Sequence, residues 1–180
     1  MTILTSVMQF AMLPMQGLAQ GAQPILSYNY GAKNKDRVKK TFKLLLTACL
    51  CFSFAIWAGI MLFPKIFASV FTPDAALIEF TANALRIYCL VLCIFGIQTA
   101  CQMTFVSIGY ATCSIIVAIV RKFVLLLPLI YVMPQLIQDK TMGVYSAEPV
   151  ADVIAVTFTA ILFAVQFKKA LNSLAKEEIN

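Results

Sequence analysis

The chain begins with an uncharged stretch, residues 1–32, that reads MTILTSVMQFAMLPMQGLAQGAQPILSYNYGA. It contains no Asp, Glu, Lys or Arg, yet it holds four glutamines. A hydrocarbon core about 30 Å thick needs roughly 20 apolar residues of helix, so this length predicts a membrane helix. Gln9, Gln16, Gln20 and Gln23 are spaced by 7, 4 and 3 residues, which places all four on one side of that helix.

An amide that faces lipid leaves its hydrogen-bonding groups unpaired, at a cost of about 1–3 kcal/mol or more. The polar stripe therefore faces other helices, as in a packed bundle, or a wet cavity, as in a transport pathway. Both alternatives stay open, and the same holds for Gln98 and Gln102, an i, i+4 pair farther along the chain. The candidates for lining a substrate cavity are Gln9, Met12, Gln16, Gln20, Gln98 and Gln102.

The composition indicates a membrane protein and excludes several other classes. The chain is 61% hydrophobic, against about 45–50% in soluble domains, and its mean hydropathy is +0.88. The net charge of +6 does not indicate nucleic-acid binding, because the cations sit at the ends of apolar blocks. There is no histidine and no nucleophile–base pair, so we expect neither an enzyme nor a metal site nor a cofactor. The six cysteines form no CxxC pair and are expected to be small buried apolar residues.

The apolar blocks predict an all-α integral membrane protein with five spans. We place these at about 1–30, 41–63, 76–107, 111–134 and 149–167. Residues 1–167 then form one bundle, and residues 168–180 form a polar tail. Residues 33–43 are expected to be a solvated basic loop, residues 72–74 a helix start, and residues 135–148 a polar connection with a turn at 140–143. Gly17 and Gly21 form a GxxxG pair that would allow another backbone to approach closely.

The distribution of cations predicts the orientation. If residues 33–43 are cytoplasmic, eleven of the 14 Lys and Arg residues lie inside or at the inner boundary, including Arg121 and Lys122. Lys65 and Lys140 then lie outside, and Arg86 is left within a span. The C-terminus is expected in the cytoplasm and the N-terminus outside, in a multi-pass protein of the plasma (inner) membrane. An uncleaved chain that starts outside suggests that Met1 is internal to a longer protein, or that the gene is truncated.

Three ionisable residues within the spans are candidates for ion coupling, because charges in a membrane are costly and usually functional. They are Glu79, Arg86 and Asp152. Glu79 and Arg86 share a helix face, and Arg86 would pair with Glu79, with Asp152 or with a carbonyl group. Asp152 lies near the outer boundary, where a carboxylate is also favoured by the dipole at a helix start.

Several segments, in order, resemble the multidrug and toxic compound extrusion (MATE) family. Residues 17–33 are similar to a family segment G-x-x-x-G-x-Q-P-x-x-x-Y-N-Y-G-A-K, and residues 143–152 resemble the G-V-W-x-A-x-P-I-A-D entry to the last helix. Residues 71–74 and 102–109, with Arg121 and Pro128, resemble the approaches to the tenth helix and the start and body of the eleventh. The resemblance implies helices eight to twelve, which form most of one lobe of a twelve-helix transporter. Tyr145 replaces a common Trp, and Tyr110 replaces a usual Lys or polar residue.

By this resemblance, the parent protein is an antiporter that exports organic, often cationic, drugs or toxins in exchange for sodium ions or protons. Its partners are the lipid bilayer, a small organic substrate, and a missing amino-terminal lobe or a second copy. The coupling acids that the family places in the missing parts cannot be carried over. Two alternatives stay open: a lipid-linked saccharide flippase, which would favour a more cationic cavity than Arg86 alone provides, and a non-transporting interaction subunit.

Overall fold

The computed structural model describes the backbone of residues 2–70, 75–136 and 140–177, and the side chains of residues 5–70, 78–79, 81–133 and 147–174. These residues form helices and no strands. The helices are α1 (Thr2–Gly31), α2 (Lys35–Leu62), α3 (Pro64–Ser69), α4 (Ala75–Tyr88), α5 (Leu92–Ser107), α6 (Ala111–Ile119), the π-helix η1 (Val120–Leu126), α7 (Leu127–Leu136) and α8 (Lys140–Glu177). The expected all-α class is confirmed.

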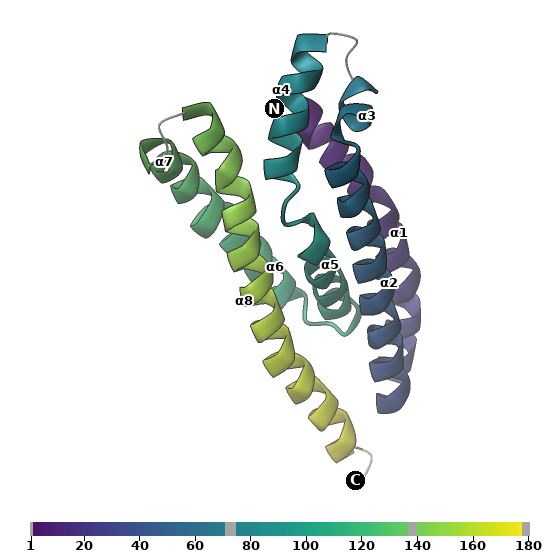
Figure 1. Ribbon diagram of the computed structural model, residues 1–180. Helices are drawn as coiled ribbons and strands as arrows, with labels where there is room; N and C mark the ends of the chain where they lie inside the picture. The colour runs from purple at the N-terminus through teal and green to yellow at the C-terminus, as the bar shows by residue number, and fades with distance from the viewer. Residues whose placement is uncertain (1, 71–74, 137–139, 178–180) are drawn as a thin grey trace.

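The helices form two groups that meet at α5 (Figure 1). One group contains α1, α2, α3 and α4, and the other contains α6, η1, α7 and α8. Helix α5 packs against α1 and α2 on one side and against α8 on the other. Its apolar residues therefore join the two groups, and the groups diverge toward the end where α4 and α7 lie.

Three helical segments in the described part of the chain are long and apolar enough to cross a membrane. They are Lys35–Leu62, Ala111–Met133 and Ala147–Leu174. The pair Thr81–Tyr88 and Leu92–Ser107 adds a fourth if the two helices are one bent span. Helix α1 has 30 residues and runs unbroken through Pro14 and Pro24 to Gly31, but it is not among these spans. The five-span division therefore remains a prediction.

The predicted third span is not one straight helix. Its chain direction changes by 47° between α4 and α5. At the break, the amide of Leu92 donates to the carbonyl of Cys89, and that of Leu90 donates to Ile87, in tight i→i+3 bonds. No proline or glycine lies in residues 87–91, so the local sequence carries no signal for this bend.

Two segments that we predicted to be non-helical connections are helical in the structure. Lys35 to Lys43 form the first turns of α2, because Asn34 caps that helix by accepting a hydrogen bond from the amide of Arg37. The last helix begins at Lys140, inside the expected polar connection, and runs through Pro149 and the expected tail to Glu177. The expected start at residues 72–74 lies outside the described residues.

The close helix approach that we predicted at Gly17 and Gly21 is absent, because no neighbouring atom lies within 4 Å of a Cβ built at either glycine. The close approach occurs at Gly96 on α5. A Cβ there would lie 2.7 Å from the carbonyl oxygen of Cys49 on α2. The hydroxyl of Ser53 lies beside it and donates to the carbonyl of Cys93 at 3.0 Å. Gly96 thus sets the distance between α2 and α5.

We expect Gly96→Ala to lower stability by about 1–3 kcal/mol, because its methyl group would press on the backbone of α2. Gly17→Ala is the matched control, since its Cβ meets open space. We expect the control to be neutral or to stabilise by up to about 1 kcal/mol. Thermal unfolding of both variants in detergent checks this, and equal melting temperatures would contradict the assigned contact.

Candidate functional site

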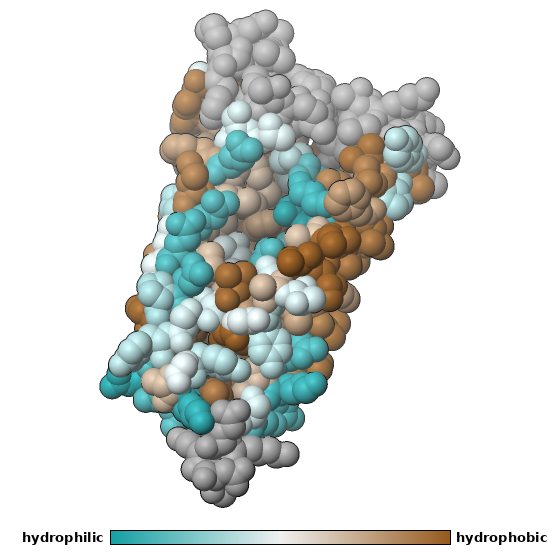
Figure 2. Space-filling view, turned by 180° about the vertical axis from the view of Figure 1, so that it is seen from behind, coloured by the Kyte–Doolittle hydropathy of each residue, from teal (hydrophilic) through white to brown (hydrophobic). Residues whose placement is uncertain are grey.

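Four helices of the described chain surround a polar hollow. It measures about 340 Å³ and lies between α1, α5, α6 and η1. Its lining residues are Met12, Gln16, Phe95, Gln98, Thr99, Gln102, Met103, Val106, Ser114 and Arg121. Figure 2 shows the back of the molecule, where hydrophilic side chains gather around a hollowed region flanked by apolar surface.

Four of the six predicted cavity residues line this hollow. Met12 and Gln16 come from α1, whereas Gln98 and Gln102 come from α5. Gln98 is buried, and its amide oxygen finds no hydrogen-bond donor among the described residues. A buried carbonyl oxygen of this kind is costly unless a partner reaches it. Gln98 therefore places a buried, unpaired amide oxygen at the wall of the hollow.

The rest of the glutamine stripe does not reach the hollow. Gln9 and Gln20 are exposed and do not line it, and Gln23 is half-buried. At the inner end of the stripe, the hydroxyl of Ser27 donates to the carbonyl of Ser107 at 2.8 Å, which ties α1 to the end of α5. The middle of the stripe thus lines the hollow, and the end of the stripe contributes to packing between helices.

Arg121, which lines the hollow, forms an ion pair with Asp152. Nε of Arg121 lies 2.7 Å from a carboxylate oxygen of Asp152, and its guanidinium carbon lies 4.7 Å from the centre of the Phe95 ring. Only 5% of the Asp152 side chain is exposed. The pair joins η1 to α8 and holds the Arg121 cation beside the polar side chains of the hollow.

This pair bears on three expectations. Arg121 and Lys122 are the eleventh and twelfth residues of the 23-residue apolar segment Ala111–Met133, and their place inside or at the inner boundary stays a prediction. Asp152 is the thirteenth residue of α8, so it is not a helix-start carboxylate. Arg86 is therefore not the one cation within a span, and the partner of Asp152 is Arg121. The π-helix that carries Arg121 precedes Pro128, whose missing N–H disrupts regular α-helical bonding there.

Two further polar residues adjoin the pair, and the sequence analysis did not select them. Glu148 lies one turn before Asp152 on α8, and Tyr88 is a buried residue of α4, which packs against α8. The i, i+4 spacing of Glu148 and Asp152 was the available signal, because it puts two carboxylates on one helix face. Tyr88, Arg121, Glu148 and Asp152 together connect α4, η1 and α8.

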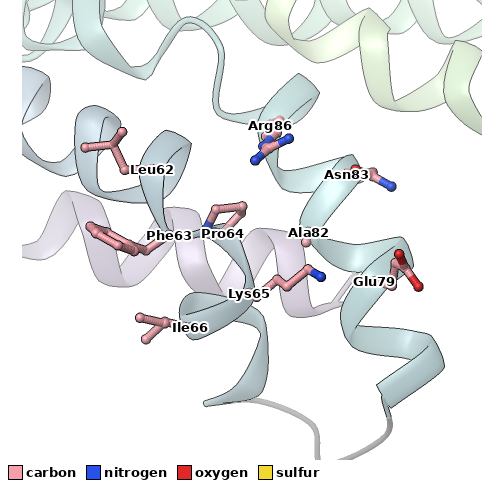
Figure 3. Close-up of a pocket in the computed structure, with 9 residues that line it drawn as sticks. All are labelled: Leu62, Phe63, Pro64, Lys65, Ile66, Glu79, Ala82, Asn83 and Arg86. Carbon is pink, nitrogen blue, oxygen red and sulfur yellow. The ribbon is translucent and has the colours of Figure 1, made fainter.

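Glu79 and Arg86 lie elsewhere, in a separate pocket of about 290 Å³ where α2 ends and α3 begins. In Figure 3, Lys65 extends from α3 toward α4, and Arg86 lies across the pocket from Leu62. No ion pair joins Glu79 to Arg86 or to Lys65 among the described side chains. Both residues are exposed, and of the three partners left open for Arg86, Glu79 does not form an ion pair with it among the described side chains.

The cysteines form neither disulfides nor a metal site. Cys49, Cys89 and Cys101 are buried as expected, but Cys51 is exposed, and Cys93 and Cys113 are half-buried. Within the described residues, no group of three His, Cys, Asp or Glu side chains could hold a metal ion.

Comparisons with known proteins agree with this geometry. The MatE family profile matches residues 1–132. The structure of the MATE multidrug transporter DinF-BH, solved as a ligand complex, is 34% identical, with a TM-score of 0.80, and the match covers 88% of this chain and 35% of that one. No curated protein sequence matches the chain.

Two other solved structures have the same fold at lower identity. An inward-facing conformation of a multidrug resistance MATE family transporter of the MOP superfamily is 19% identical, with a TM-score of 0.84 over 96% of this chain and 39% of that one. A crystal structure of MATE in the bent conformation is 18% identical, with a TM-score of 0.89 over 97% and 38%. The chain thus spans little more than a third of the length of these relatives.

We expect Arg121→Gln and Asp152→Asn each to destabilise the fold by about 3 kcal/mol, because each leaves the other charge buried without its partner. The double variant should lose less free energy of unfolding than the sum of the two single losses, with a coupling energy above about 1 kcal/mol. Lys122→Gln, one residue along the same helix and exposed, is the control. Chemical unfolding in detergent measures all four free energies, and additive losses would contradict the pair.

Proposed function

Because the chain belongs to the MatE family, we propose that it forms most of one lobe of a secondary active transporter that exports organic, often cationic, compounds in exchange for sodium ions or protons. The observation that carries this proposal is the hollow in which Gln16, Gln98 and Gln102 come together with Arg121. Amide groups accept or donate hydrogen bonds without fixing a charge, so they suit substrates of varied structure.

The whole transporter needs a second lobe to close the pathway. The relatives are more than twice as long as this chain, in keeping with two lobes that move against each other around a central site. We propose that the second lobe comes from further residues of the same protein, from a separate chain or from a second copy. Residues 33–43 and the C-terminus face the cytoplasm in this arrangement, and the first residue of α1 lies outside.

The Arg121–Asp152 pair supplies a coupling mechanism. While Asp152 is ionised, it neutralises Arg121, and the hollow accepts an organic cation. When a proton or a sodium ion binds at Asp152, the Arg121 cation is no longer neutralised and repels the substrate from the hollow. Glu148 lies one turn away and adds negative charge that favours the incoming ion. Coupling ion and substrate therefore exclude each other, as antiport requires.

The flippase alternative has less support in this geometry. A phosphate-bearing substrate needs unpaired cations in the hollow, but Asp152 neutralises Arg121. Arg86 lies in the separate pocket at the end of α2.

We expect Gln98→Leu to lower the efflux of ethidium, a fluorescent organic cation, about tenfold, because the change removes a buried acceptor worth about 1–1.5 kcal/mol. Gln9→Leu is the matched control, since Gln9 belongs to the glutamine stripe but does not line the hollow. Efflux is measured in vesicles that contain the intact transporter carrying this segment. Equal losses in both variants, or none in Gln98→Leu, would contradict the site.

We expect Asp152→Asn to abolish ethidium efflux whether or not a proton or sodium gradient is imposed. The amide cannot neutralise Arg121, so the Arg121 cation repels the substrate in every state. Efflux is compared with and without each gradient in the same vesicles. Efflux that keeps its full dependence on the gradient would exclude a coupling role for Asp152. In the parent protein, the gradient whose removal abolishes efflux identifies the coupling ion.

A further inference from the structure

A basic groove, separate from the functional hollow, lies between the first half of α2 and the last part of α8. It measures about 610 Å³. Its lining residues are Lys35, Lys39, Phe42, Lys43, Leu46, Ala164, Phe167, Lys168, Leu171 and Asn172. Neither the hollow nor the Arg121–Asp152 pair shares a residue with it.

Four lysines surround the groove. Lys35, Lys39 and Lys43 are spaced by four residues, so they lie on one face of α2, and Lys168 faces them from α8. None of the four forms an ion pair within the described part of the chain. Asp36 does not line the groove, but it shares a neighbouring depression with Lys39, Lys40 and Lys43. The groove lining therefore holds four lysines and no carboxylate, with Asp36 beside two of these lysines.

The base of the groove is apolar and rigid. The rings of Phe42 and Phe167 lie 5.2 Å apart, and both stack on Phe163, whose ring centre is 4.6 Å from that of Phe42 and 4.7 Å from that of Phe167. Phe163 is buried against Phe105 of α5. Leu46 and Leu171 extend this apolar surface along the two helices. The base thus continues from the lysines toward the apolar middle of α2 and α8.

We propose that this groove binds an anionic phospholipid, with its phosphate among Lys35, Lys39, Lys43 and Lys168 and an acyl chain along Phe42, Leu46 and Phe167. A lipid of this kind is the one ligand class that satisfies both parts of the groove. A small anion such as phosphate would neutralise the lysines but leave the apolar base uncovered, and a neutral lipid would do the reverse. The two helices that form the groove are both long enough to cross a membrane, so an acyl chain reaches the base from the bilayer.

The site connects α2 to α8, which belong to the two helix groups that meet at α5. A lipid held by both helices would fix their separation at this end of the lobe. Binding therefore depends on the fold alone and does not require that the chain transports drugs.

The test compares two pairs of lysine variants that remove the same charge from the same helices. Lys43→Gln/Lys168→Gln removes two groove lysines, whereas Lys40→Gln/Lys169→Gln removes the exposed lysines next to Lys39 and Lys168 that lie outside the groove. Phosphatidylglycerol binding to the purified full chain is titrated by native mass spectrometry, with phosphatidylcholine as the neutral lipid and inorganic phosphate as the free anion.

We expect phosphatidylglycerol to bind about 30-fold more weakly to the groove pair, because each lysine near an anionic headgroup contributes roughly fivefold. The control pair should keep most of its affinity. Equal weakening of both pairs would overturn the proposal in favour of diffuse attraction. Equal binding of phosphatidylcholine, or displacement of the lipid by millimolar phosphate, would overturn it as well.

A second variant tests the apolar base without changing any charge. Ala164→Phe places a ring in the groove, and Ala55→Phe places one on an exposed position of α2 outside it. Phosphatidylglycerol affinity should fall in the first variant alone. Unchanged affinity in Ala164→Phe would show that no acyl chain lies along the base. Thermal unfolding of each variant without lipid confirms that the comparison is between folded proteins.

Discussion

The constraint on which this structure depends is that a polar group between lipid-crossing helices needs a partner. The chain meets it with local bonds, such as those from the Thr104 and Thr159 hydroxyls to carbonyls one turn earlier. Between helices, the chain satisfies this constraint with the Ser53–Cys93 hydrogen bond and the Arg121–Asp152 ion pair. Two buried polar atoms of the described residues have no partner, the indole nitrogen of Trp57 and the amide oxygen of Gln98, and of these two residues Gln98 lines the hollow.

Much of the fold and part of the site follow from simple patterns. The uncharged length of residues 1–32 predicted a long helix, and α1 runs from Thr2 to Gly31. The spacing of Gln16, Gln98 and Gln102 predicted polar faces, and three distant positions meet in one hollow. These features could be predicted from the sequence, because helical periodicity and the free-energy cost of an unpaired polar group in a membrane act on each segment by itself.

Features that depend on contacts between distant segments could not be predicted from the sequence. The break between Tyr88 and Leu92 has no proline or glycine to mark it, and α4, which ends at Tyr88, packs against α8. Gly96, without a GxxxG partner, makes the close approach, whereas the motif at Gly17 and Gly21 makes none. The Arg121–Asp152 pair was not predicted, because it joins η1 to α8 across 31 residues of sequence.

The most direct test of the central claim is whether the glutamine side of α1 meets water within the membrane. In a protein whose six native cysteines are replaced by alanine, single cysteines at Gln16 and Phe10 are exposed in intact membranes to a charged thiol reagent that does not cross lipid. Gln16→Cys should be labelled and Phe10→Cys, on a different side of the same helix, should be protected. Labelling at Phe10 with protection at Gln16 would mean that the amides face lipid, and the proposed pathway would be wrong.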